Sequence, residues 1–552
     1  MNRCPRVFTR RNLARLPVLA VCLLLLALLL VLPQATLLSK ALTNRSGEFV
    51  GLANYVRYFN NPNLATSVAN TLDISIWSTL ISVSCAFLYA YALSRTRIQG
   101  KALFRCTALI PIFLPTIVHA LGLVYLFGRQ GLLTRAGLFD GAIYGRLGII
   151  LAEVIFTFPQ AYLMLSVALE YSDGRLYEAA DSMAVSGFRK LIHITLPEIS
   201  YSLVNTFFVC FTLSFTDFGA PKVIGGSYNV LATDIYKLVV GQFDMNMGAV
   251  VATLLLIPAL LSFVADRLLS GKNSAVINAR ATRLNIKPNL LRDLFFQCFC
   301  LAVSLFFLSL IAALAIGAFS TYYPYDLAPT LENFIFNPSA GGIRSYFNSL
   351  LMALLTAGLG TLFIFVYAYV MEKTEAFKPA RRLGSMLAVV PLALPGMVIG
   401  LAFIFFFNAR QNPLHFIYGT VLILVLSNIL HYFSVPYLTA VGALKKLDRE
   451  YESTSDSLGV PRLKAFLAVS VPLSLPAILE IFMYLFVNAM VTVSAVVFLY
   501  SANFKIAAIA ISHMEEAGDI GQAAAMSLLI LLVNVVVRVL YEVSIYLIGR
   551  KP

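Results

Sequence analysis

Two polar stretches, one in each half of the chain, decide how this sequence folds. The first starts EAADSMAV and ends ITLP over residues 178–197, and the second starts STSDSLGV and ends VSVP over residues 453–472. Asp181 and Asp456 both lie sixteen residues before the closing proline, so the two copies align without a gap. Both stretches are amphipathic and stand between long apolar segments. A chain that repeats such a stretch is expected to present paired docking surfaces outside a bilayer.

The composition predicts a membrane protein. Apolar residues make up 59% of the 552 positions and charged residues 12%, about half the share in a globular protein. Runs of about twenty apolar residues, enough to cross ~30 Å of hydrocarbon as a helix, recur along the chain. Helices are expected because backbone polar groups in lipid must be paired within the segment. We expect twelve spans, near residues 16–39, 72–93, 106–128, 147–169, 199–217, 248–269, 294–319, 349–371, 385–407, 418–442, 475–499 and 521–548.

The distribution of basic residues predicts the topology. The net charge of +14 arises from 41 basic and 27 acidic residues, and 29 of the basic ones fall in alternating loops. The positive-inside rule then places both termini and both polar stretches in the cytoplasm, as an even number of spans also requires. The run from Leu16 to Leu38 is longer than a usual signal region and no clear cleavage site follows it, so we expect it to be retained. The positive charge therefore indicates topology and not nucleic-acid binding.

The duplication extends beyond the polar stretches. Near-constant offsets of 275 to 280 residues indicate a six-span unit used twice, and an even number of spans per unit makes the copies parallel. Paired prolines in the third span of each half predict kinks there. The recurring motifs are IPIFLP at 110–115 with VPLALP at 390–395, NTL at 70–72 with NSL at 348–350, and LANY at 52–55 with LENF at 331–334.

Each polar stretch is expected to form a short helix and a turn before the chain re-enters the membrane. The alanines of the first copy favour a helix, and Glu178 and Asp181 fall in its first turns, where the helix dipole favours acids. In the second copy a serine can cap the helix beside Asp456. Ala184 and Gly459 are small enough to let another surface approach closely.

These residues resemble the EAA loop of ABC-importer permeases, where Glu-Ala-Ala precedes a glycine and then Leu-Pro. The first copy has Ala184 where that family has glycine, and the second has Ser453-Thr454-Ser455 for Glu-Ala-Ala, with Glu452 one place early. In the family this loop is the coupling helix that fits a groove on the ATPase subunit. The resemblance therefore implies the coupling residues Glu178, Ala179, Ala180, Asp181, Ala184, Leu196, Pro197, Glu452, Ser453, Asp456, Gly459 and Pro472.

The resemblance covers the whole chain and implies its fold. It indicates a fused permease of the type I, methionine-permease-like class: an all-α, polytopic protein of the bacterial inner membrane, with about twelve transmembrane helices in two parallel six-helix repeats. We expect one half at 1–270, with a coupling loop at 171–198, and one at 293–552, with a coupling loop at 443–473. A cytoplasmic linker at 271–292 would join them.

The energy source is expected to lie in other chains. No Gly-x-x-x-x-Gly-Lys-Ser/Thr sequence occurs, and neither Gly100-Lys101 nor Gly271-Lys272 has a phosphate-cradling glycine upstream. We expect a transport subunit with no catalytic residues and no cofactor of its own. The resemblance implies two ABC ATPase subunits, expected as a homodimer, that bind ATP and Mg²⁺ beneath the polar stretches. It also implies a periplasmic or extracellular substrate-binding protein.

A further resemblance concerns the substrate. Residues 217–226, DFGAPKVIGG, followed by NVLATDIY at 229–236, resemble permeases for 2-aminoethylphosphonate, and EAGD at 516–519 adds to the likeness. Close relatives of such permeases transport ferric iron. We therefore expect 2-aminoethylphosphonate as the substrate, with ferric iron as the alternative.

Polar residues inside spans indicate a transport pathway, because burying them in lipid is costly. Interhelical hydrogen bonding is the competing interpretation. Two other charged residues, Glu153 and Arg538, are expected to form a buried pair or to lie near an interface. On the fifth span of each half the predicted pathway residues are Ser214, Thr216 and Asp217, with Asn488, Thr492 and Ser494 as counterparts.

Two other classes of protein were weighed. An ion-coupled secondary transporter in two parallel halves would need charges at the membrane midplane, and these are nearly absent apart from Glu153 and Arg538. A membrane enzyme would need a cluster of nucleophile, base or metal ligands, and no such pattern occurs. Six of the seven cysteines lie in or beside apolar spans, and no Cys/His metal spacing occurs, so no metal site is expected.

Overall fold

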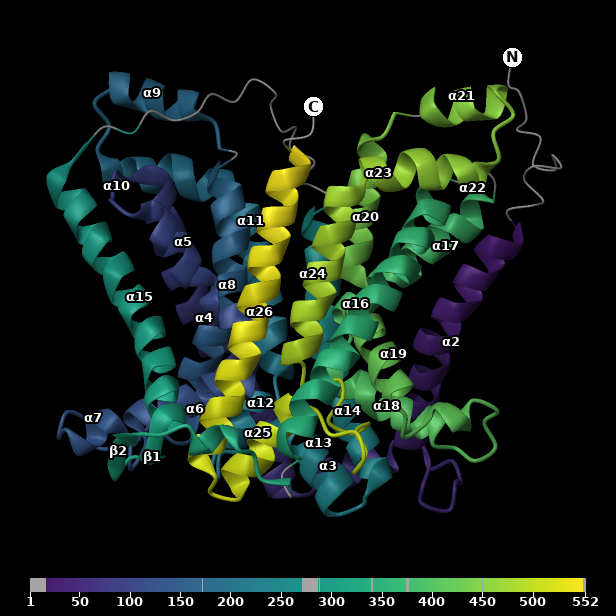
Figure 1. The fold of residues 1–552 in the computed structure, drawn as a ribbon, viewed down its shortest axis with the longest axis horizontal. Helices are drawn as coiled ribbons and strands as arrows, with labels where there is room; N and C mark the ends of the chain where they lie inside the picture. Colours follow the sequence, from purple (N-terminus) through teal and green to yellow (C-terminus); the bar gives the residue numbers. More distant parts are fainter. Residues whose placement is uncertain are drawn as a thin grey trace. The chain divides into compact units, whose positions relative to one another are not determined.

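The computed structural model describes residues 16–170, 172–270, 286, 288–338, 341–373, 377–448 and 450–549. Most of the predicted linker 271–292 and the basic residues of both chain ends lie outside the described residues. The described part is built almost wholly of helices, with one small hairpin (Figure 1). Nine of its helices are long and apolar enough to cross a membrane, and three bent helix pairs bring the number to twelve. Each overlaps one of the predicted spans, so the all-α polytopic fold is confirmed.

The described residues form two compact units that do not follow the two sequence halves. We call Tyr55–Ile335 with Ile511–Leu528 the N-unit, and the described parts of Met1–Asn54, Phe336–Ala510 and Leu529–Pro552 the C-unit. The first span of each half is exchanged: α2 (Leu16–Ala41) packs on α16, α17 and α18, whereas α15 (Leu290–Phe319) packs on α4, α5 and α6. The two packing units therefore do not coincide with the two sequence repeats.

The N-unit has α4 and α8 at its centre, packed on each other and both on α11. In Figure 1, α9 and α10 lie at one end of these helices, and α7, β1 and β2 lie at the other. Its elements are α3 (Ala53–Phe59), α4 (Pro62–Arg95), α5 (Lys101–Leu109), η1 (Ile110–Phe113), α6 (Thr116–Phe127), α7 (Leu132–Arg135), α8 (Arg146–Glu170), α9 (Gly174–Ser182), α10 (Gly187–Lys190), η2 (Leu191–Thr195), α11 (Leu196–Thr216), α12 (Gly219–Ile224), α13 (Leu231–Tyr236), η3 (Lys237–Gly241), α14 (Met245–Ser270), α15, β1 (Ser320–Tyr322), β2 (Asp326–Pro329) and η4 (Glu332–Phe334). The two strands pair antiparallel, with Tyr322 opposite Asp326.

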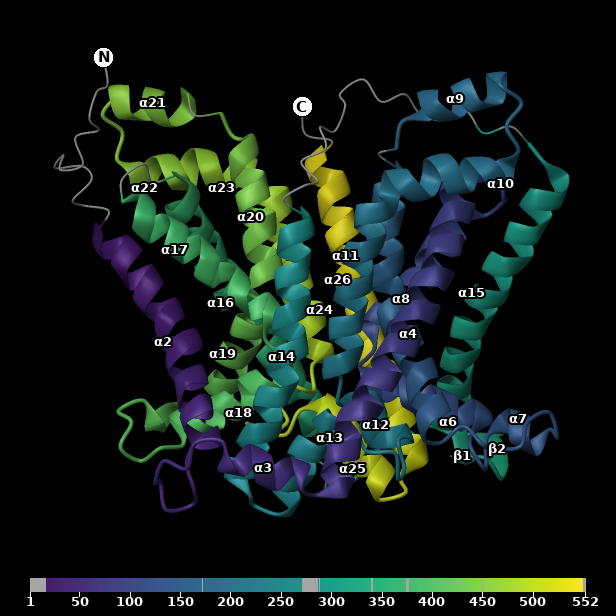
Figure 2. The same ribbon diagram turned by 180° about the vertical axis from the view of Figure 1, so that it is seen from behind.

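The C-unit is centred on α16, which packs on α24, α20 and α19. The start of α2 and the end of α26 lie at the same end of this unit as α21 (Figures 1 and 2). Its elements are α2, α16 (Gly342–Lys373), α17 (Lys378–Val389), η6 (Val390–Ala393), α18 (Gly396–Phe407), η7 (His415–Ile417), α19 (Val421–His431), α20 (Ser434–Lys446), α21 (Glu450–Ser457), α22 (Arg462–Ala465), η8 (Phe466–Ser470), α23 (Val471–Leu473) and α24 (Leu475–Val491). Two further helices, α25 (Ala507–Glu516) and α26 (Ile520–Gly549), are divided between the units.

Two of the duplicated motifs supply asparagines that tie backbone together. Asn54 donates to the carbonyl oxygens of Ala41 and Thr43, both at 2.9 Å, where α2 ends. Asn333 does the same for Ala318 (3.1 Å) and Ser320 (2.7 Å) at the end of α15. These carbonyls follow the last helical turn and would otherwise lack partners. The LANY and LENF motifs therefore cap the exchanged spans.

The Asn-Thr-Leu motif fastens a short helix between the fifth and sixth spans. Asn70 donates to the carbonyl of Asn229 (2.9 Å), and Thr71 accepts the Leu231 N–H (2.9 Å) at the start of α13. In the C-unit Asn348 donates to the Lys505 carbonyl (3.0 Å), and Ser349 accepts the Ala507 N–H (2.7 Å) at the start of α25. Hydroxyl capping of a free helix N–H explains why the second residue of the motif is Thr or Ser.

The paired prolines break the third span completely, so the predicted kink is an underestimate. In the N-unit α5 ends at Leu109, a 3₁₀ turn follows, and α6 starts after Pro115. The corresponding helices of the C-unit, α17 with η6 and α18, are bent by 111°. Proline removes two N–H donors within five residues, and the carbonyl of Pro111 is bonded instead by the Leu114 N–H at 3.2 Å and by the Nε2 of His119 at 3.0 Å. His119 is thus a structural residue of this break.

Candidate functional site

The first polar loop (residues 171–198) begins with a capped helix. The Asp173 carboxylate accepts the Arg175 N–H at 3.1 Å, which satisfies a free donor at the start of α9. The Glu198 carboxylate accepts the Asp173 N–H at 2.7 Å and so joins the two ends of the loop. Asp181 forms an ion pair with Lys190 of α10. The helix and turn predicted for this loop are therefore present, but α9 starts at Gly174, so the expectation that Glu178 and Asp181 fall in its first turns is wrong. The expected serine cap of the second loop is wrong for the same reason, because α21 already starts at Glu450.

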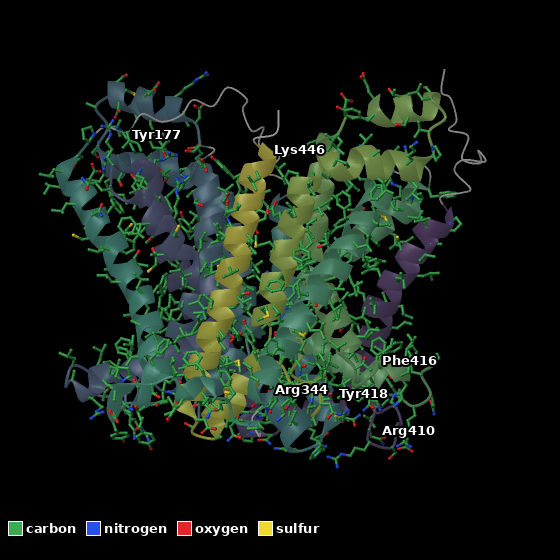
Figure 3. All side chains as sticks on the ribbon, viewed as in Figure 1. Tyr177, Arg344, Arg410, Phe416, Tyr418 and Lys446 are labelled. Carbon is green, nitrogen blue, oxygen red and sulfur yellow. The ribbon has the colours of Figure 1, made fainter. Side chains whose placement is uncertain are left out.

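A buried arginine anchors this loop to the membrane helices. Arg95, at the end of α4, donates to the Leu169 carbonyl (2.8 Å) and to the Ser172 hydroxyl. Its guanidinium stacks 4.9 Å from the ring centre of Tyr177, and the Tyr177 hydroxyl bonds the hydroxyl of Thr195 at 2.7 Å. Figure 3 labels Tyr177 at this end of the N-unit. These contacts hold α9 against the ends of α4 and α8.

The second polar loop (residues 443–473) is fastened by a lysine at the place of Arg95. Lys373 takes the place of Arg95 and donates to the Leu447 carbonyl at 3.3 Å, the counterpart of Leu169. Aromatic packing adds to this, since the rings of Tyr369 and Phe466 are 4.6 Å apart. The backbone of α21 is described, but the side chains of Glu452, Ser453 and Asp456 lie outside the described residues. Their predicted coupling role stays a prediction.

Both loops end their first helix with the same left-handed turn. The Val185 N–H bonds the Ala180 carbonyl (3.0 Å) and the Val460 N–H bonds the Ser455 carbonyl (3.0 Å), the six-to-one bond of a Schellman motif. The residue in the left-handed conformation is Ala184, at φ 53°, in the first loop and Gly459, at φ 67°, in the second. The left-handed conformation therefore explains the glycine of the second loop, whereas Ala184 carries the strain of a Cβ at this position. Whether it also lets a partner approach closely stays a prediction.

Large apolar side chains stand exposed at the same four positions of each loop. In the first loop they are Leu176, Met183, Phe188 and Ile192, and in the second Tyr451, Leu458, Leu463 and Leu467. Each pair is 275 residues apart, and all eight side chains are between 41% and 74% exposed. We call each set of four an apolar quartet. Sequence reasoning missed the quartets because it followed the acidic and small residues; the signal available was apolar identity repeated at the loop offset.

The chain re-enters the membrane through a π-helical turn in both halves. Turn η2 precedes Leu196 and Pro197, and turn η8 precedes Pro472. Such turns are rare and often mark functional sites, and the proline that follows cannot donate within the helix. The helix then continues without a break to Thr216 in the first half, whereas the second is bent by 76° around Ser474. A second proline, Pro476, accounts for that interruption.

The predicted pathway residues are bound mainly within their own unit. Ser214 bonds the hydroxyl of Ser78 at 2.7 Å, across from α11 to α4. Thr216 donates to the Thr212 carbonyl (2.9 Å) and Asn488 to the Tyr484 carbonyl (2.8 Å), each one turn back on its own helix. Thr492 is buried and Ser494 packs against Gly396. These contacts agree with structural hydrogen bonding, and a direct role in transport stays a prediction.

Asp217 links two helix starts. Its carboxylate accepts the Thr116 hydroxyl of α6 (2.8 Å) and the Ala220 N–H of α12 (2.9 Å). The fully buried Glu153 of α8 contacts it directly. Of the two expectations for Glu153 and Arg538, the buried pair is wrong, because Arg538 pairs with Glu542 four residues along its own exposed helix. Within the described ranges, no group of three His, Cys, Asp or Glu side chains is placed to hold a metal.

Two repeats of membrane helices with matching exposed loops define a duplicated transport subunit. The family of binding-protein-dependent transport system inner membrane components matches residues 74–271 and 368–545, one match in each half. The chain belongs to this family. It is therefore a multi-pass inner-membrane permease of an ABC importer, fused from two halves.

Three relatives match both halves. A ferric transport system permease protein of Actinobacillus pleuropneumoniae is 28% identical over 512 residues, which cover 90% of this chain and 73% of that protein. A putative ferric transport system permease of Haemophilus influenzae is 28% identical over 476 residues, covering 83% and 74%. A second Haemophilus influenzae protein, an Fe(3+)-transport system permease, is 24% identical over 490 residues, covering 88% and 90%. The expectation of 2-aminoethylphosphonate finds no support among these relatives, whereas the ferric alternative does.

Proposed function

We propose that this chain is the permease of a ferric-iron importer and that its two polar loops dock on a pair of ABC ATPase subunits. The observation that carries the docking role is the matched pair of apolar quartets. Side chains of this size stay exposed on a polar loop at a cost, since each would gain about 1.5–3 kcal/mol from full burial. An exposed apolar patch rimmed by polar residues marks an interaction site.

The duplication favours two equivalent partner surfaces. Because the four positions recur at one constant offset, a groove that accepts the first quartet can accept the second. That is what a homodimer of ATPase subunits would offer. The shared apolar positions supply the common contact, and Glu178, which is exposed, adds a charge at a position where the second loop has Ser453.

Ferric iron is favoured as the substrate by the names of the relatives. The three relatives described above are ferric or Fe(3+) permeases. Family membership implies that a separate binding protein presents the cargo, so this chain needs no iron cluster of its own. Coupling would follow alternating access, in which ATP binding by the partner subunits draws the two loops together.

Uptake by cells tests the substrate. The chain would be expressed with its neighbouring ATPase and binding-protein genes in cells that lack other ferric importers, and uptake of radioactive ferric citrate measured. We expect uptake that depends on the chain and is unaffected by excess 2-aminoethylphosphonate. If the cells took up no iron but did take up 2-aminoethylphosphonate, the substrate would be assigned to the phosphonate instead.

Copurification with the ATPase tests the docking surface. A double variant with Met183→Glu and Leu458→Glu places a charge in each quartet, and we expect the ATPase to be lost from the purified complex. Leu138→Glu is the matched control, since Leu138 is 75% exposed and follows α7 at the opposite end of the N-unit. Retention of the ATPase by the double variant would contradict the proposed docking role.

A further inference from the structure

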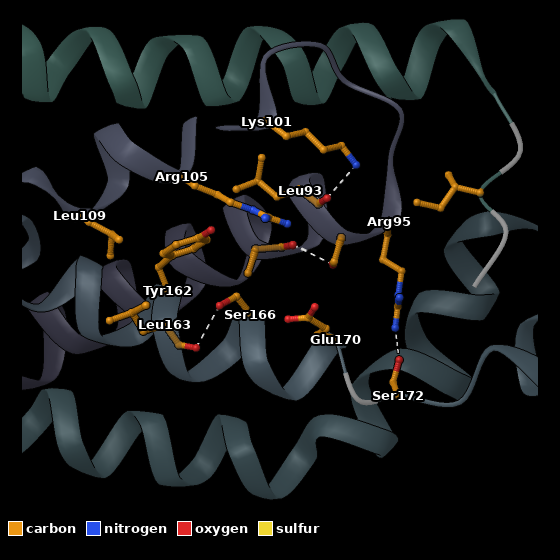
Figure 4. A pocket seen from close by; sticks show the side chains of 13 residues that line it. Leu93, Arg95, Lys101, Arg105, Leu109, Tyr162, Leu163, Ser166, Glu170 and Ser172 are labelled. Atoms are coloured by element: carbon orange, nitrogen blue, oxygen red, sulfur yellow. Dashed lines mark hydrogen bonds between the residues drawn. The ribbon is translucent and has the colours of Figure 1, made fainter. Parts of the chain in front are cut away.

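A cavity of about 430 Å³ lies between α4, α5 and α8 of the N-unit, beside the first polar loop (Figure 4). Three cationic side chains line it, Arg95, Lys101 and Arg105, together with one acid, Glu170. The volume far exceeds the ~10–15 Å³ that a single water needs, so the cavity can hold a ligand of many atoms. Nothing in the coupling role proposed above uses it.

The three cations keep hydrogen-bond donors that the described residues do not use. Lys101 donates to the carbonyls of Leu93 (2.7 Å) and Thr96 (2.6 Å), which occupies two of its three protons. Arg95 is only 8% exposed, and its Nε finds no acceptor. Arg105 is exposed and lies beside Tyr162 on the cavity wall (Figure 4).

The carboxylates described here do not balance this cluster. Among the described residues, none of the three cations forms an ion pair. Glu170 is the one acid in the lining, and it offsets at most one of the three positive charges. Asp293 of α15 is already paired with Arg292 at 2.7 Å. Like charges gathered in excess of their counter-charge are destabilising, so an anion bound there would stabilise the fold.

The corresponding place in the C-unit is built differently. Arg381 stands for Lys101 and donates to the Met371 carbonyl at 2.6 Å, the counterpart of Leu93. At the position of Arg105 the C-unit has Ser385, which accepts the Tyr437 hydroxyl at 3.0 Å. The fold therefore does not require a cation at that position. Arg105 is a feature of the first half alone.

We propose that this cavity binds a phosphate-bearing anion, and that its source is the head group of an anionic membrane lipid. Arginine presents a planar fork of donors that matches phosphate oxygens. Basic pockets between transmembrane helices are known sites for acidic lipid head groups. Besides the cations, the lining includes Leu93, Leu109 and Leu163, which suit the glycerol and first acyl carbons of a lipid better than a bare phosphate.

The ligand would also act on the first polar loop. Arg95 donates to the Ser172 hydroxyl at the start of that loop, and the Nε of the same guanidinium has no acceptor among the described residues. A phosphate oxygen accepting from that Nε would fix the guanidinium in place. Lipid binding would then stiffen the N-unit's docking loop, while the C-unit's loop has no such support from an Arg105 equivalent.

Binding to the purified full-length chain tests the proposal without iron or ATPase, so its result is independent of the proposed function. In neutral detergent, calorimetry would compare short-chain phosphatidylglycerol, phosphatidylcholine of the same chain length, and inorganic phosphate. We expect phosphatidylglycerol to bind at least about tenfold more tightly than phosphatidylcholine, and Arg105→Gln to weaken it about tenfold, the size expected for one charge-assisted bond. Arg382→Gln removes an exposed charge from α17 of the C-unit and should change binding less than about twofold.

Other results of the binding experiment would identify the source of the anion or overturn the proposal. Inorganic phosphate that binds alone and displaces phosphatidylglycerol, with the same loss in Arg105→Gln, would keep the phosphate chemistry and make the source a free anion. Equal binding of the two lipids, or equal losses in both variants, would overturn the proposal. Arg105→Lys, which keeps the charge but not the fork, should retain part of the affinity. Thermal unfolding of each variant checks that the fold is intact.

Discussion

The two polar loops share their backbone and differ in some of their charged residues. Both have a short helix, a left-handed turn, a π-helical re-entry and four exposed apolar side chains at matched positions. Arg95, Tyr177 and Glu198 fasten the first, whereas Lys373 and aromatic packing are the contacts described at the second. The comparison teaches that shape and apolar contact are what the two halves have in common. Glu178 and the arginine anchor are particular to the first half, since Ser453 and Lys373 take their places in the second.

The same difference recurs elsewhere in the duplicated fold. At the loop offset of 275, Asn428 and Thr492 stand where the first half has Glu153 and Asp217. A smaller pair shows how closely the halves compensate. The Thr116 hydroxyl occupies the space over Gly219 in the N-unit, while in the C-unit Ser494 occupies the space over Gly396, with the hydroxyl and the glycine exchanged. In both halves a hydroxyl therefore fills the space over a glycine, and only the side of the contact that supplies the hydroxyl differs.

The sharpest test of loop equivalence uses single variants. Met183→Glu and Leu458→Glu should each lower recovery of the partner ATPase by a similar factor, at least about fivefold, because both bury a charge in the same kind of groove. Quantitative copurification from one expression strain measures this. A large loss from one variant and none from the other would break the comparison.

The second test concerns a buried acid of the first half. Burial raises the pKa of Asp234, on α13, to about 6, and Ala510 stands at the corresponding place of α25. The folded protein therefore favours the neutral form of the Asp234 carboxyl. The folding stability that this form contributes is complete below about pH 4 and is lost as the pH rises through about 6. The loss is on the order of 3 kcal/mol. Thermal unfolding from pH 4 to 8 should show it, and Asp234→Asn should flatten that part of the profile.

A third test compares the two anchors. Arg95→Ala should loosen the first loop by about 1–3 kcal/mol, because it leaves the Leu169 carbonyl without its partner. Lys373→Ala should loosen the second loop less, since its bond to the Leu447 carbonyl is longer at 3.3 Å. Hydrogen exchange of residues 174–182 and 450–457 reports each loop separately. Equal deprotection in both variants would mean that the anchors are interchangeable.

The smallest expected effect comes from the left-handed turns. Ala184→Gly should stabilise the first loop, and Gly459→Ala should destabilise the second, each by about 1 kcal/mol, because L-residues pay that strain at positive φ. No atom lies within 4 Å of a Cβ added to Gly459, so the change isolates strain from crowding. Local hydrogen exchange should move in opposite directions for the two variants; a shift in the same direction would point to a contact other than the turn.

Sequence patterns predicted the spans, the duplication and the place of the polar loops, because each follows from local hydropathy or exact spacing. They also located the matched asparagines and prolines. They did not predict what these residues do: the asparagines cap the exchanged spans and the short helices, and the prolines end the helix altogether. Such roles depend on partners 11 to 159 residues away, which spacing alone does not reveal.

What the sequence by itself determined is the class of protein: a duplicated, helical, inner-membrane permease, since hydropathy and a repeated motif are properties of the linear chain. Only the tertiary structure decided that the first span of each half packs in the other unit, that eight apolar side chains remain exposed on the two loops, and that three cations meet at one cavity. The physical reason is the same for each. Exposure, charge clustering and helix exchange are set by which distant segments come together, and a linear pattern carries no record of that.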